Sequence, residues 1–343
     1  MKSPGRVAVS SHAARACVIF PGALGDFVCF LPALQVITRA AHVDLFAHSE
    51  FSGIVPPNVT VRGLESVEIS QLFVRNAAQN SVLQNFFGAY SAVYSWMGGG
   101  LIEFVDQLQT LSNGCAKIFP FRPGGTTEHL ADYYLRCLAS LECQNCQPVI
   151  ELRAEAMAWC ENFWARHALN RQAVLALSPG SGAREKNWSE EFFLEVVDWW
   201  RESTGGTVVL LIGPVEAERG GVDRLRQSCV VANELSLSQV AAILGRSDIY
   251  LGNDSGISHL AAALGTRTVV IFGPSDARQW APRGKKVTVV SRRIDCSPCS
   301  VSTMKSCPHR ACLTELFPET IVQTIAALPE LSTLTRGGVG IRV

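Results

Sequence analysis

The chain has no excess of charge of either sign and no long apolar run. Its 30 basic and 30 acidic residues give a formal net charge of zero, so the basic surface typical of nucleic-acid-binding proteins is absent from the chain as a whole. No segment approaches the ~20 apolar residues of a membrane-spanning helix. The beginning of the chain mixes Arg, Ser and Pro and lacks the apolar stretch of a signal peptide. We therefore expect a cytoplasmic protein that binds no nucleic acid.

Cysteine content and chain length predict the state of the thiols and the number of domains. The 12 cysteines occur without a secretory signal, so we expect reduced thiols rather than a disulfide framework. The chain has 343 residues, of which 48% are hydrophobic and 17% charged. Because this length exceeds what a single core usually supports, two domains are expected, with a boundary near residue 153.

Apolar runs that read as strands alternate with helical patterns along the whole chain, as in parallel sheets covered by helices. Strands are expected at residues 15–20, 42–47, 92–95, 116–119, 173–177, 207–212, 249–251, 268–272 and 287–291. Helices are expected at 26–40, 101–110, 128–141, 154–167, 189–203, 216–228, 238–244 and about 318–329. Pro32 predicts that the first helix is short or kinked. The pattern favours two doubly wound domains, 1–153 and 154–343, facing a central cleft. The last helix is expected to pack back on the N-terminal domain.

Residues 250–274 are the most informative segment. A strand leads into the turn Gly-Asn-Asp-Ser-Gly, which is followed by a helix of small residues and a second strand. Such a turn presents backbone N–H groups at a helix N-terminus, where unpaired amides and the helix dipole favour a phosphate. The same residues are also ordinary turn and N-cap chemistry. The small-residue helix favours close packing around a bound group. The candidate ligands are Asp254, Ser255, Gly256 and His259.

A second turn follows the strand that ends near residue 177. It reads Pro-Gly-Ser-Gly and continues to Lys186 and a helix start at Ser189. It is not a Walker A loop, which requires Gly-Lys-Ser/Thr directly at the helix. Ser181 and the amide of Gly182 can meet phosphate oxygens, and Lys186 supplies a compact positive charge. A solvated surface loop is the alternative, but a second phosphate-type turn in the same half favours binding.

Two carboxylates occupy helix starts after predicted strands. Asp26 follows the turn that contains Gly22 and Gly25, where it is equally consistent with a helix cap and with a general base. Glu216 opens a helix after the strand at 207–212. It is consistent with compensation of the helix dipole or with acceptance of a hydrogen bond from a ribose hydroxyl.

These segments together resemble the ADP-heptose:lipopolysaccharide heptosyltransferases, glycosyltransferase family 9. The matching motifs are an N-terminal GDxxxxLPAL, SPGSGxxxKxW, GNDSGxxHLAAALGTxTVxxFGP and a following WAPRG. They extend over residues 18 to about 325 in the family's order. The resemblance implies the GT-B fold, which consists of two Rossmann-like domains with the active site between them. It also implies transfer of heptose from ADP-heptose to a lipopolysaccharide inner-core acceptor, with inversion at the anomeric carbon.

By position, the resemblance implies that Asp26 deprotonates the acceptor hydroxyl and that Lys186 neutralises the diphosphate leaving group, with Ser181 and Gly182 beside it. Amides and a lysine suit the charge that develops on the departing phosphate. The chain contains no Asp-x-Asp pair, so no metal or other cofactor is expected to activate the diphosphate.

The remaining implied roles concern the donor and the surroundings of the enzyme. Glu216 would contact the ribose. The diphosphate and sugar would be held by Asp254, Ser255, Gly256 and His259. A lipid-linked acceptor implies peripheral contact with the cytoplasmic face of the inner membrane.

The chain departs from the family's pattern in two places. Pro-Gly-Ser-Gly replaces a more Thr-rich loop, and the segment from Gly213 to Glu216 is shorter than in some members. Two alternatives therefore stay open. One is a GT-B glycosyltransferase that uses another nucleotide-sugar or a protein acceptor. The other is an inactive assembly protein that has kept the nucleotide site and binds a metal.

Four cysteines lie within a short segment near the C-terminus: Cys296, Cys299, Cys307 and Cys312. Four thiolates suit tetrahedral zinc or a single iron, and His309 could replace one of them. The spacing differs from that of a common zinc ribbon. Reduced thiols that pack as small hydrophobic side chains are the alternative.

Overall fold

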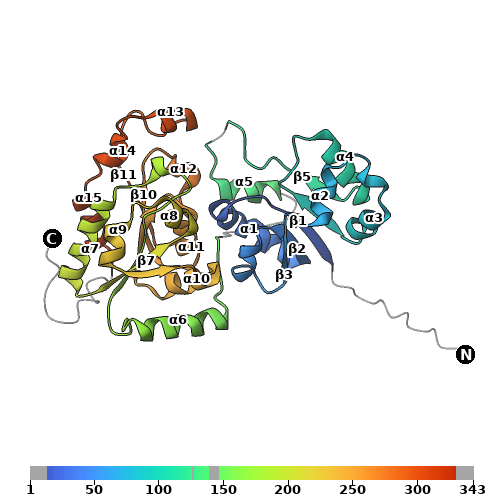
Figure 1. The fold of residues 1–343 in the computed structure, drawn as a ribbon. Coiled ribbons are helices and arrows are strands. Elements are labelled where there is room, and N and C mark those ends of the chain that lie inside the picture. The colour runs from blue at the N-terminus through green and yellow to red at the C-terminus, as the bar shows by residue number, and fades with distance from the viewer. Residues whose placement is uncertain (1–13, 126, 139–146, 330–343) are drawn as a thin grey trace, which may run out of the picture. The chain divides into compact units, whose positions relative to one another are not determined.

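The computed structural model describes residues 14–125, 127–138 and 147–329 (Figure 1). It contains two parallel β-sheets with helices packed against them. The first sheet has the strand order β3-β2-β1-β4-β5, and the second has β11-β10-β9-β6-β7-β8. Counted from its own first strand, each sheet has the order typical of doubly wound nucleotide-binding folds. The predicted class of two doubly wound α/β sheets is confirmed.

The first sheet occupies the N-terminal part of the chain. Its strands are β1 (Arg15–Ile19), β2 (His42–Ala47), β3 (Val59–Gly63), β4 (Ala92–Ser95) and β5 (Ala116–Ile118). The α-helices of this part are α1 (Leu24–Ala40), α2 (Val67–Ser70), α3 (Ser81–Gly88) and α4 (Ile102–Leu111). Short 3-10 helices are η1 (Ser49–Gly53), η2 (Gln71–Phe73) and η3 (Ala77–Gln79).

The second sheet follows α5 (Leu130–Cys137) and α6 (Ala154–Arg166). Its strands are β6 (Val174–Ser178), β7 (Thr207–Ile212), β8 (Val230–Asn233), β9 (Ile249–Asn253), β10 (Arg267–Phe272) and β11 (Val287–Ser291). Its helices are η4 (Arg184–Lys186), α7 (Glu190–Thr204), α8 (Pro214–Arg219), α9 (Asp223–Ser228), α10 (Leu237–Arg246), α11 (Gly256–Ala263), α12 (Ala277–Trp280), α13 (Val301–Ser306), α14 (Ala311–Thr314) and α15 (Pro318–Ala326).

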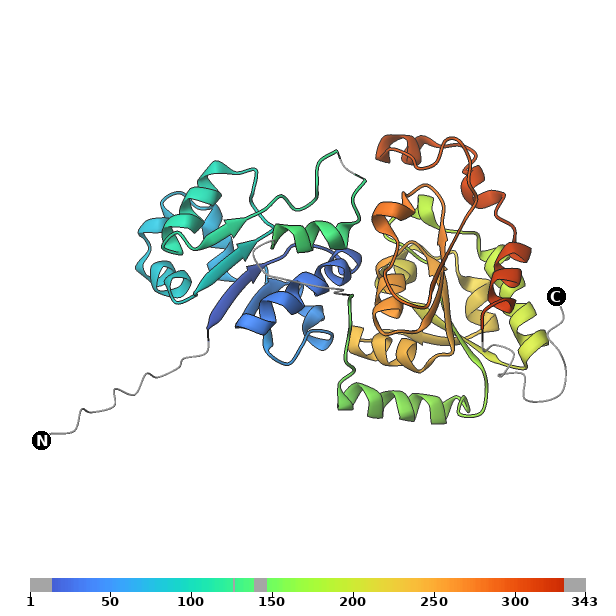
Figure 2. The same ribbon diagram turned by 180° about the vertical axis from the view of Figure 1, so that it is seen from behind.

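Helices cover both faces of the second sheet. In Figures 1 and 2, α7, α9 and α15 lie on one face, and α6, α10 and α11 lie on the other. The last helix, expected on the N-terminal domain, is α15. Its fully buried Ile321 and Ile325 belong to the same core cluster as Val196 and Trp200 of α7. The helix therefore contributes to the core beside the second sheet.

The chain packs as two compact units that divide α1 between them. One unit comprises the described residues up to Pro21, Leu34–Ser49 and Pro57–Phe121. The other comprises Gly22–Ala33, Glu50–Pro56 and the described residues from Arg122 onward. The first half of α1, which carries Asp26, thus packs with the second sheet. The boundary expected at residue 153 stays a prediction.

The structure differs from the expected elements in three places. The first helix is not short, because α1 runs through Pro32 over 17 residues, and burial of its apolar side chains outweighs one lost hydrogen bond; a kink at this proline stays a prediction. The helix expected at 216–228 is two helices. Gly220 and Gly221 separate them with φ of +66° and +81°, which glycine adopts without strain. The edge strands β3 and β8 were missed, because both are short and only partly buried. The last residues of the helix expected at 128–141 lie outside the described residues.

No helix in the described part of the chain combines the length and apolarity needed to cross a bilayer.

A buried carboxylate in the first sheet binds side chains from three neighbouring segments. Asp44 of β2 is only 3% exposed, and its Oδ2 accepts hydrogen bonds from Arg15 Nη2 at 2.5 Å and from the hydroxyl of Tyr90 at 2.8 Å. Arg62 Nε lies 3.6 Å from Oδ1. Burial raises the pKa of Asp44, but the hydrogen bonds from Arg15 and Tyr90 and the charges of the two arginines outweigh it, so the pKa lies below its usual range.

Replacing Asp44 by Ala removes the ionised acceptor and leaves the Tyr90 hydroxyl without it. We expect a loss of about 2–3 kcal/mol in the free energy of unfolding at pH 7, measured by urea denaturation. Because the folded-state pKa is lowered, the carboxylate stabilises the protein fully above the pKa of an unfolded Asp, ~3.9, and less as pH falls through the folded-state value. The difference between variant and wild type should therefore shrink in acid.

The control is Glu103→Ala, which removes an exposed ion pair whose Arg75 Nε and Glu103 Oε1 lie 4.0 Å apart. Its effect should stay below about 0.5 kcal/mol. Equal stability of the Asp44→Ala protein and the wild type would contradict the role given to this carboxylate.

Candidate functional site

The second sheet changes the direction of its strand order between β6 and β9. These strands are adjacent and parallel, and Ser178 pairs with Gly252 at their carboxyl ends. The loop after β6 leads to α7, and the short turn after β9 leads to α11. Ligands of doubly wound sheets bind at such a switch point, outside the carboxyl ends of the strands. Both predicted phosphate-binding turns therefore lie at the position that this fold uses for ligands.

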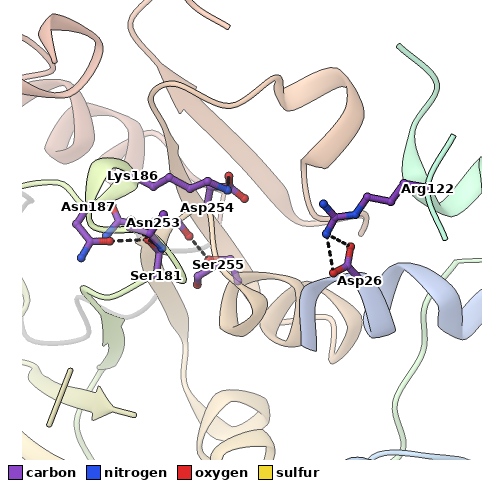
Figure 3. A network of polar contacts seen from close by, with 10 residues as sticks. Asp26, Arg122, Ser181, Lys186, Asn187, Asn253, Asp254 and Ser255 are labelled. Carbon is purple, nitrogen blue, oxygen red and sulfur yellow. Dashed lines mark hydrogen bonds and ion pairs between the residues drawn. The ribbon is translucent and has the colours of Figure 1, made fainter. Parts of the chain in front are cut away.

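Asn253, the last residue of β9, joins these two turns. Its side chain is fully buried. Its Oδ1 accepts a hydrogen bond from the backbone N of Trp188 at 3.0 Å, and its Nδ2 donates to the carbonyl oxygen of Pro179 at 2.6 Å (Figure 3). One amide thus fixes both ends of the loop after β6. Sequence reasoning missed Asn253, although its place in the Gly-Asn-Asp-Ser-Gly turn was a signal.

The two turns also meet through opposite charges. Lys186 Nζ lies 2.7 Å from Oδ2 of Asp254, whose side chain is 8% exposed, whereas that of Lys186 is 28% exposed (Figure 3). The Ser181 hydroxyl lies 2.6 Å from Oδ1 of Asn187 and 2.7 Å from the carbonyl oxygen of Ala183. The Ser181 hydroxyl has one proton to donate and two acceptors within reach, and both acceptors belong to its own loop. Its hydrogen bonding therefore holds the loop in this conformation.

The turn after β9 forms the start of α11 as predicted. Ser255 is the N-cap residue, and its hydroxyl makes no capping hydrogen bond. Instead it lies 3.4 Å from the hydroxyl oxygen of Ser258. The amides of Gly256 and of the next residues begin an eight-residue helix, where unpaired N–H groups favour an anion.

The starts of α1 and α11 are in contact through two glycines. A Cβ atom added to Gly256 would lie 2.8 Å from Cβ of Leu24, which is closer than side chains approach one another. A Cβ atom on Gly25 would lie 3.5 Å from Cα of Gly256 and from Cδ2 of His259. The absence of a side chain on Gly256 therefore allows the two helix N-termini to meet. The first turn of α1 thus lies beside the turn between β9 and α11.

Asp26 lies in that first turn of α1, and its side chain is 10% exposed. Both of its carboxylate oxygens lie 3.0 Å from Nη2 of Arg122 (Figure 3). Burial raises the pKa of Asp26 above its usual value, and it is opposed by the charges of Arg122 and Lys186 and by the hydrogen bond from Arg122. The raised pKa suits a group that must take up a proton, and the charge of Lys186 acts on Asp26 within one site.

Arg122 was not predicted from the sequence. It lies in the loop after β5, and its guanidinium carbon is 4.9 Å from the ring centroid of Trp280, within range of a cation–π contact. Half of its side chain is exposed. The Arg-Pro-Gly-Gly sequence after an expected strand marked a loop, but nothing in it indicated a partner almost 100 residues away.

His259 has protein partners rather than an open face. Its side chain is buried, and Nδ1 lies 3.5 Å from Sγ of Cys29. Burial lowers the pKa of His259 to about 4, although Asp254 and a hydrogen bond with the backbone of Trp280 act in the opposite direction. The imidazole is therefore neutral near pH 7. Its predicted role in holding the donor stays a prediction.

Glu216 of α8 lies beside Gly180 in the loop after β6. Its Oε2 accepts a hydrogen bond from the backbone N of Gly213 at 3.0 Å. A Cβ atom on Gly180 would overlap its carboxylate. Both glutamate and glycine line a pocket together with Ser181, Asn187 and Trp188. The predicted ribose contact and the predicted phosphate loop thus share one pocket, and the roles of these side chains stay predictions.

The four C-terminal cysteines line one pocket together with His309. Cys299 Sγ lies 3.0 Å from the carbonyl oxygen of Cys296, and Cys307 Sγ accepts a hydrogen bond from the backbone N of Arg310 at 3.4 Å. Cys312 is buried in the hydrophobic core. Among the described residues, which include all four, no group of three His, Cys, Asp or Glu side chains could hold a metal ion. The structure gives the predicted zinc or iron site no support.

The model of glycosyltransferase family 9 (heptosyltransferase) matches residues 134–308, about half of the chain. Lipooligosaccharide heptosyltransferase 2 of Campylobacter jejuni subsp. jejuni serotype O:2 is 26% identical over 166 residues, which are 45% of this chain and 50% of that protein. The match thus spans about half the length of this relative.

Two solved structures match nearly the whole chain. A glycosyl transferase family 9 protein from Veillonella parvula superposes with a TM-score of 0.74 at 21% identity, covering 94% of this chain and 97% of the other. The ADP-heptose lps heptosyltransferase II of E. coli gives a TM-score of 0.69 at 17% identity, covering 91% and 98%. At these identities the likeness concerns the fold, and it confirms the predicted GT-B class. The family match, the fold and the order of the motifs agree, and the chain belongs to glycosyltransferase family 9 (heptosyltransferase).

Proposed function

We propose that the chain is an inverting glycosyltransferase that transfers a heptose from ADP-heptose to an acceptor in the lipopolysaccharide core. The family and the names of the similar proteins support the donor and the acceptor class. The mechanism rests on the surroundings of Asp26. The charges of Arg122 and Lys186 act on its carboxylate, and it lies where the start of α1 contacts the start of α11.

The proposed reaction is a single displacement. Asp26 takes the proton of the acceptor hydroxyl while the acceptor oxygen forms a bond to the anomeric carbon of the heptose. The bond from that carbon to the phosphate oxygen breaks on the opposite face, and ADP leaves with the electron pair. A carboxylate suits the proton transfer because its pKa is raised by burial.

The leaving diphosphate is proposed to lie at the N-terminus of α11. Negative charge grows on its bridging oxygen as the bond breaks, and preorganised amides at Ser255 and Gly256 together with the Lys186 ammonium stabilise that charge. In the structure Lys186 is paired with Asp254. The lysine would therefore exchange a carboxylate partner for the diphosphate. The ribose would lie in the pocket beside Glu216.

The first test replaces Asp26 by Asn, which keeps the shape of the side chain and removes its ability to take a proton. We expect transfer to fall roughly 100- to 10,000-fold, while calorimetric binding of ADP without added metal is retained. Glu103→Gln is the matched control, because it neutralises another carboxylate that lies beside an arginine, Arg75, in the other compact unit. Undiminished turnover by Asp26→Asn would overturn the base assignment. Preference for UDP or GDP over ADP would overturn the donor.

A second test concerns the nucleotide pocket. Gly180→Ala forces the Glu216 carboxylate to move, since the new methyl group would occupy its place. We expect ADP to bind about tenfold more weakly, equivalent to about one hydrogen bond, and thermal stability to change little because the glutamate end is flexible. Gly100→Ala is the control, since an added Cβ there meets nothing within 4 Å. Unchanged ADP affinity of Gly180→Ala would remove Glu216 from the binding pocket.

Peripheral contact with the cytoplasmic face of the inner membrane belongs to the same proposal, because a lipid-linked acceptor lies there. In the first unit, η2 packs against both α2 and α4. These elements and their ends carry exposed large apolar side chains, namely Val67, Phe73, Val74, Leu101 and Ile102, which are 50–80% exposed. Arg75, which is 88% exposed, lies beside them with Glu103 at 4.0 Å, so the apolar side chains rather than net positive charge would make the contact with a bilayer surface.

The test measures co-sedimentation with vesicles of phosphatidylethanolamine and phosphatidylglycerol. Replacing both Phe73 and Ile102 by Asp should reduce the bound fraction at least about tenfold, because each apolar side chain contributes roughly 1.5–3 kcal/mol when buried. Met157→Asp, at an exposed apolar position of α6 in the other unit, is the control and should bind like the wild type. Equal vesicle binding by all three proteins would show that Phe73 and Ile102 do not contact the membrane. Absence of binding by the wild type would contradict the proposed membrane contact.

A further inference from the structure

Cys29 lies one helical turn after Asp26 on α1 and is 4% exposed. Its Sγ lies 3.5 Å from Nδ1 of His259, which is 6% exposed. Because hydrogen bonds that involve sulfur are longer than those between oxygen and nitrogen, this distance is within their range. The contact joins the helix that carries the proposed base to the helix that carries the proposed phosphate site. The reaction proposed above uses neither side chain.

The two partners of His259 define its tautomer. The backbone of Trp280 raises the pKa of His259, as a carbonyl acceptor does when a ring N–H donates to it. Since Nδ1 faces Cys29, we assign the contact with the Trp280 backbone to Nε2. Nδ1 of the neutral ring is then an acceptor, and the Cys29 thiol is its donor. Burial raises the pKa of the thiol and keeps the proton on sulfur.

These contacts close a ring of interactions around the proposed base. From Asp26 the ring passes to Arg122 through the 3.0 Å contacts, and from Arg122 to the Trp280 ring at 4.9 Å. It returns from the Trp280 backbone through His259 to Cys29, and along one turn of α1 to Asp26. We therefore expect a change at Cys29 to act on Asp26 through His259, Trp280 and Arg122.

We propose that Cys29 is a positioning residue, whose thiol proton holds His259 in the Nε2–H tautomer and thereby fixes the Trp280–Arg122 pair against the carboxylate of Asp26. The proposal rests on the proposed function, because it assigns the ring to the placement of a general base. It adds a residue that neither the sequence motifs nor the family resemblance indicated. Reaction rates depend steeply on the placement of such a group, and a displacement of about 1 Å can cost roughly a hundredfold.

The ring also bears on the pKa of Asp26. Burial raises the pKa of this carboxyl, and Arg122 and Lys186 lower it. If Arg122 loses its support from Trp280, burial remains and the pKa of Asp26 rises further. Since the ionised form is the base, the acid limb of kcat/KM then moves to higher pH. The other groups facing Cys29 and His259 are Asp254, His129, Lys186 and Arg283, and Tyr134 faces Asp26 and Cys29.

The experiment compares Cys29→Ala, Cys29→Ser and Cys160→Ala. Cys29→Ala removes the donor, so we expect kcat to fall roughly ten- to a hundredfold, the acid limb to move to higher pH and ADP affinity to stay unchanged. Cys29→Ser keeps a donor and should restore most of kcat. Cys160 is another buried thiol, which donates to the carbonyl oxygen of Ala242 at 3.4 Å away from the ring, and Cys160→Ala should leave both kcat and the pH profile unchanged.

Nitrogen NMR of the histidine rings tests the contact without any activity. The His259 signals are assigned by their loss in His259→Gln. In the wild type at pH 7, Nε2 should carry the proton and Nδ1 should show the shift of a hydrogen-bonded acceptor, a pattern that Cys29→Ser keeps and Cys29→Ala loses. A proton on Nδ1 in the wild type overturns the proposal even if Cys29→Ala fails to fold, as does a Cys29→Ala enzyme with an unchanged acid limb. If instead Asp26→Asn stays active while the NMR pattern holds, the proposed function fails and the ring remains as a structural contact.

Discussion

The close approach of Gly25 and Gly256 is the constraint on which the rest of the site depends. Two helix N-termini meet there, and a single added methyl group on Gly256 would collide with Leu24. Because the helices meet so closely, the first turn of α1 supplies a carboxylate to the same site to which α11 supplies amides. Both ends of the proposed displacement therefore depend on one backbone contact, which belongs to a single compact unit of the protein.

A second feature of the site is that two of its carboxylates are paired with basic side chains. Asp26 is paired with Arg122, and Lys186 is paired with Asp254. Partly buried charges require such partners, because desolvation of an isolated charge costs more than the fold can offset. Neutral groups hold these pairs in place: Asn253 fixes the loop that carries Lys186, and Trp280 supports Arg122.

The sequence was sufficient for the positions of most strands along the chain and for the turns that carry Asp26, Lys186 and Asp254, because these features depend on local periodicity and on glycine at helix starts. It was not sufficient for contacts between distant segments. The contacts of Arg122 with Asp26 and of Cys29 with His259 became visible only in the folded chain, as did the role of Asn253 in holding the loop that ends at Trp188. The short edge strands β3 and β8 were missed for a related reason, since their pairing with β2 and β7 contributes more to their formation than their own composition does.

The pairing of Lys186 with Asp254 bears on how a donor reaches the site. An unpaired lysine would attract an anionic ligand over about a Debye length, ~8 Å at physiological salt. A lysine matched by a carboxylate 2.7 Å away has little field at that range, so this pair by itself attracts a diphosphate only weakly from a distance. Under the proposed function, Lys186 therefore contributes to donor binding by an exchange of partners at contact rather than by attraction through the solvent.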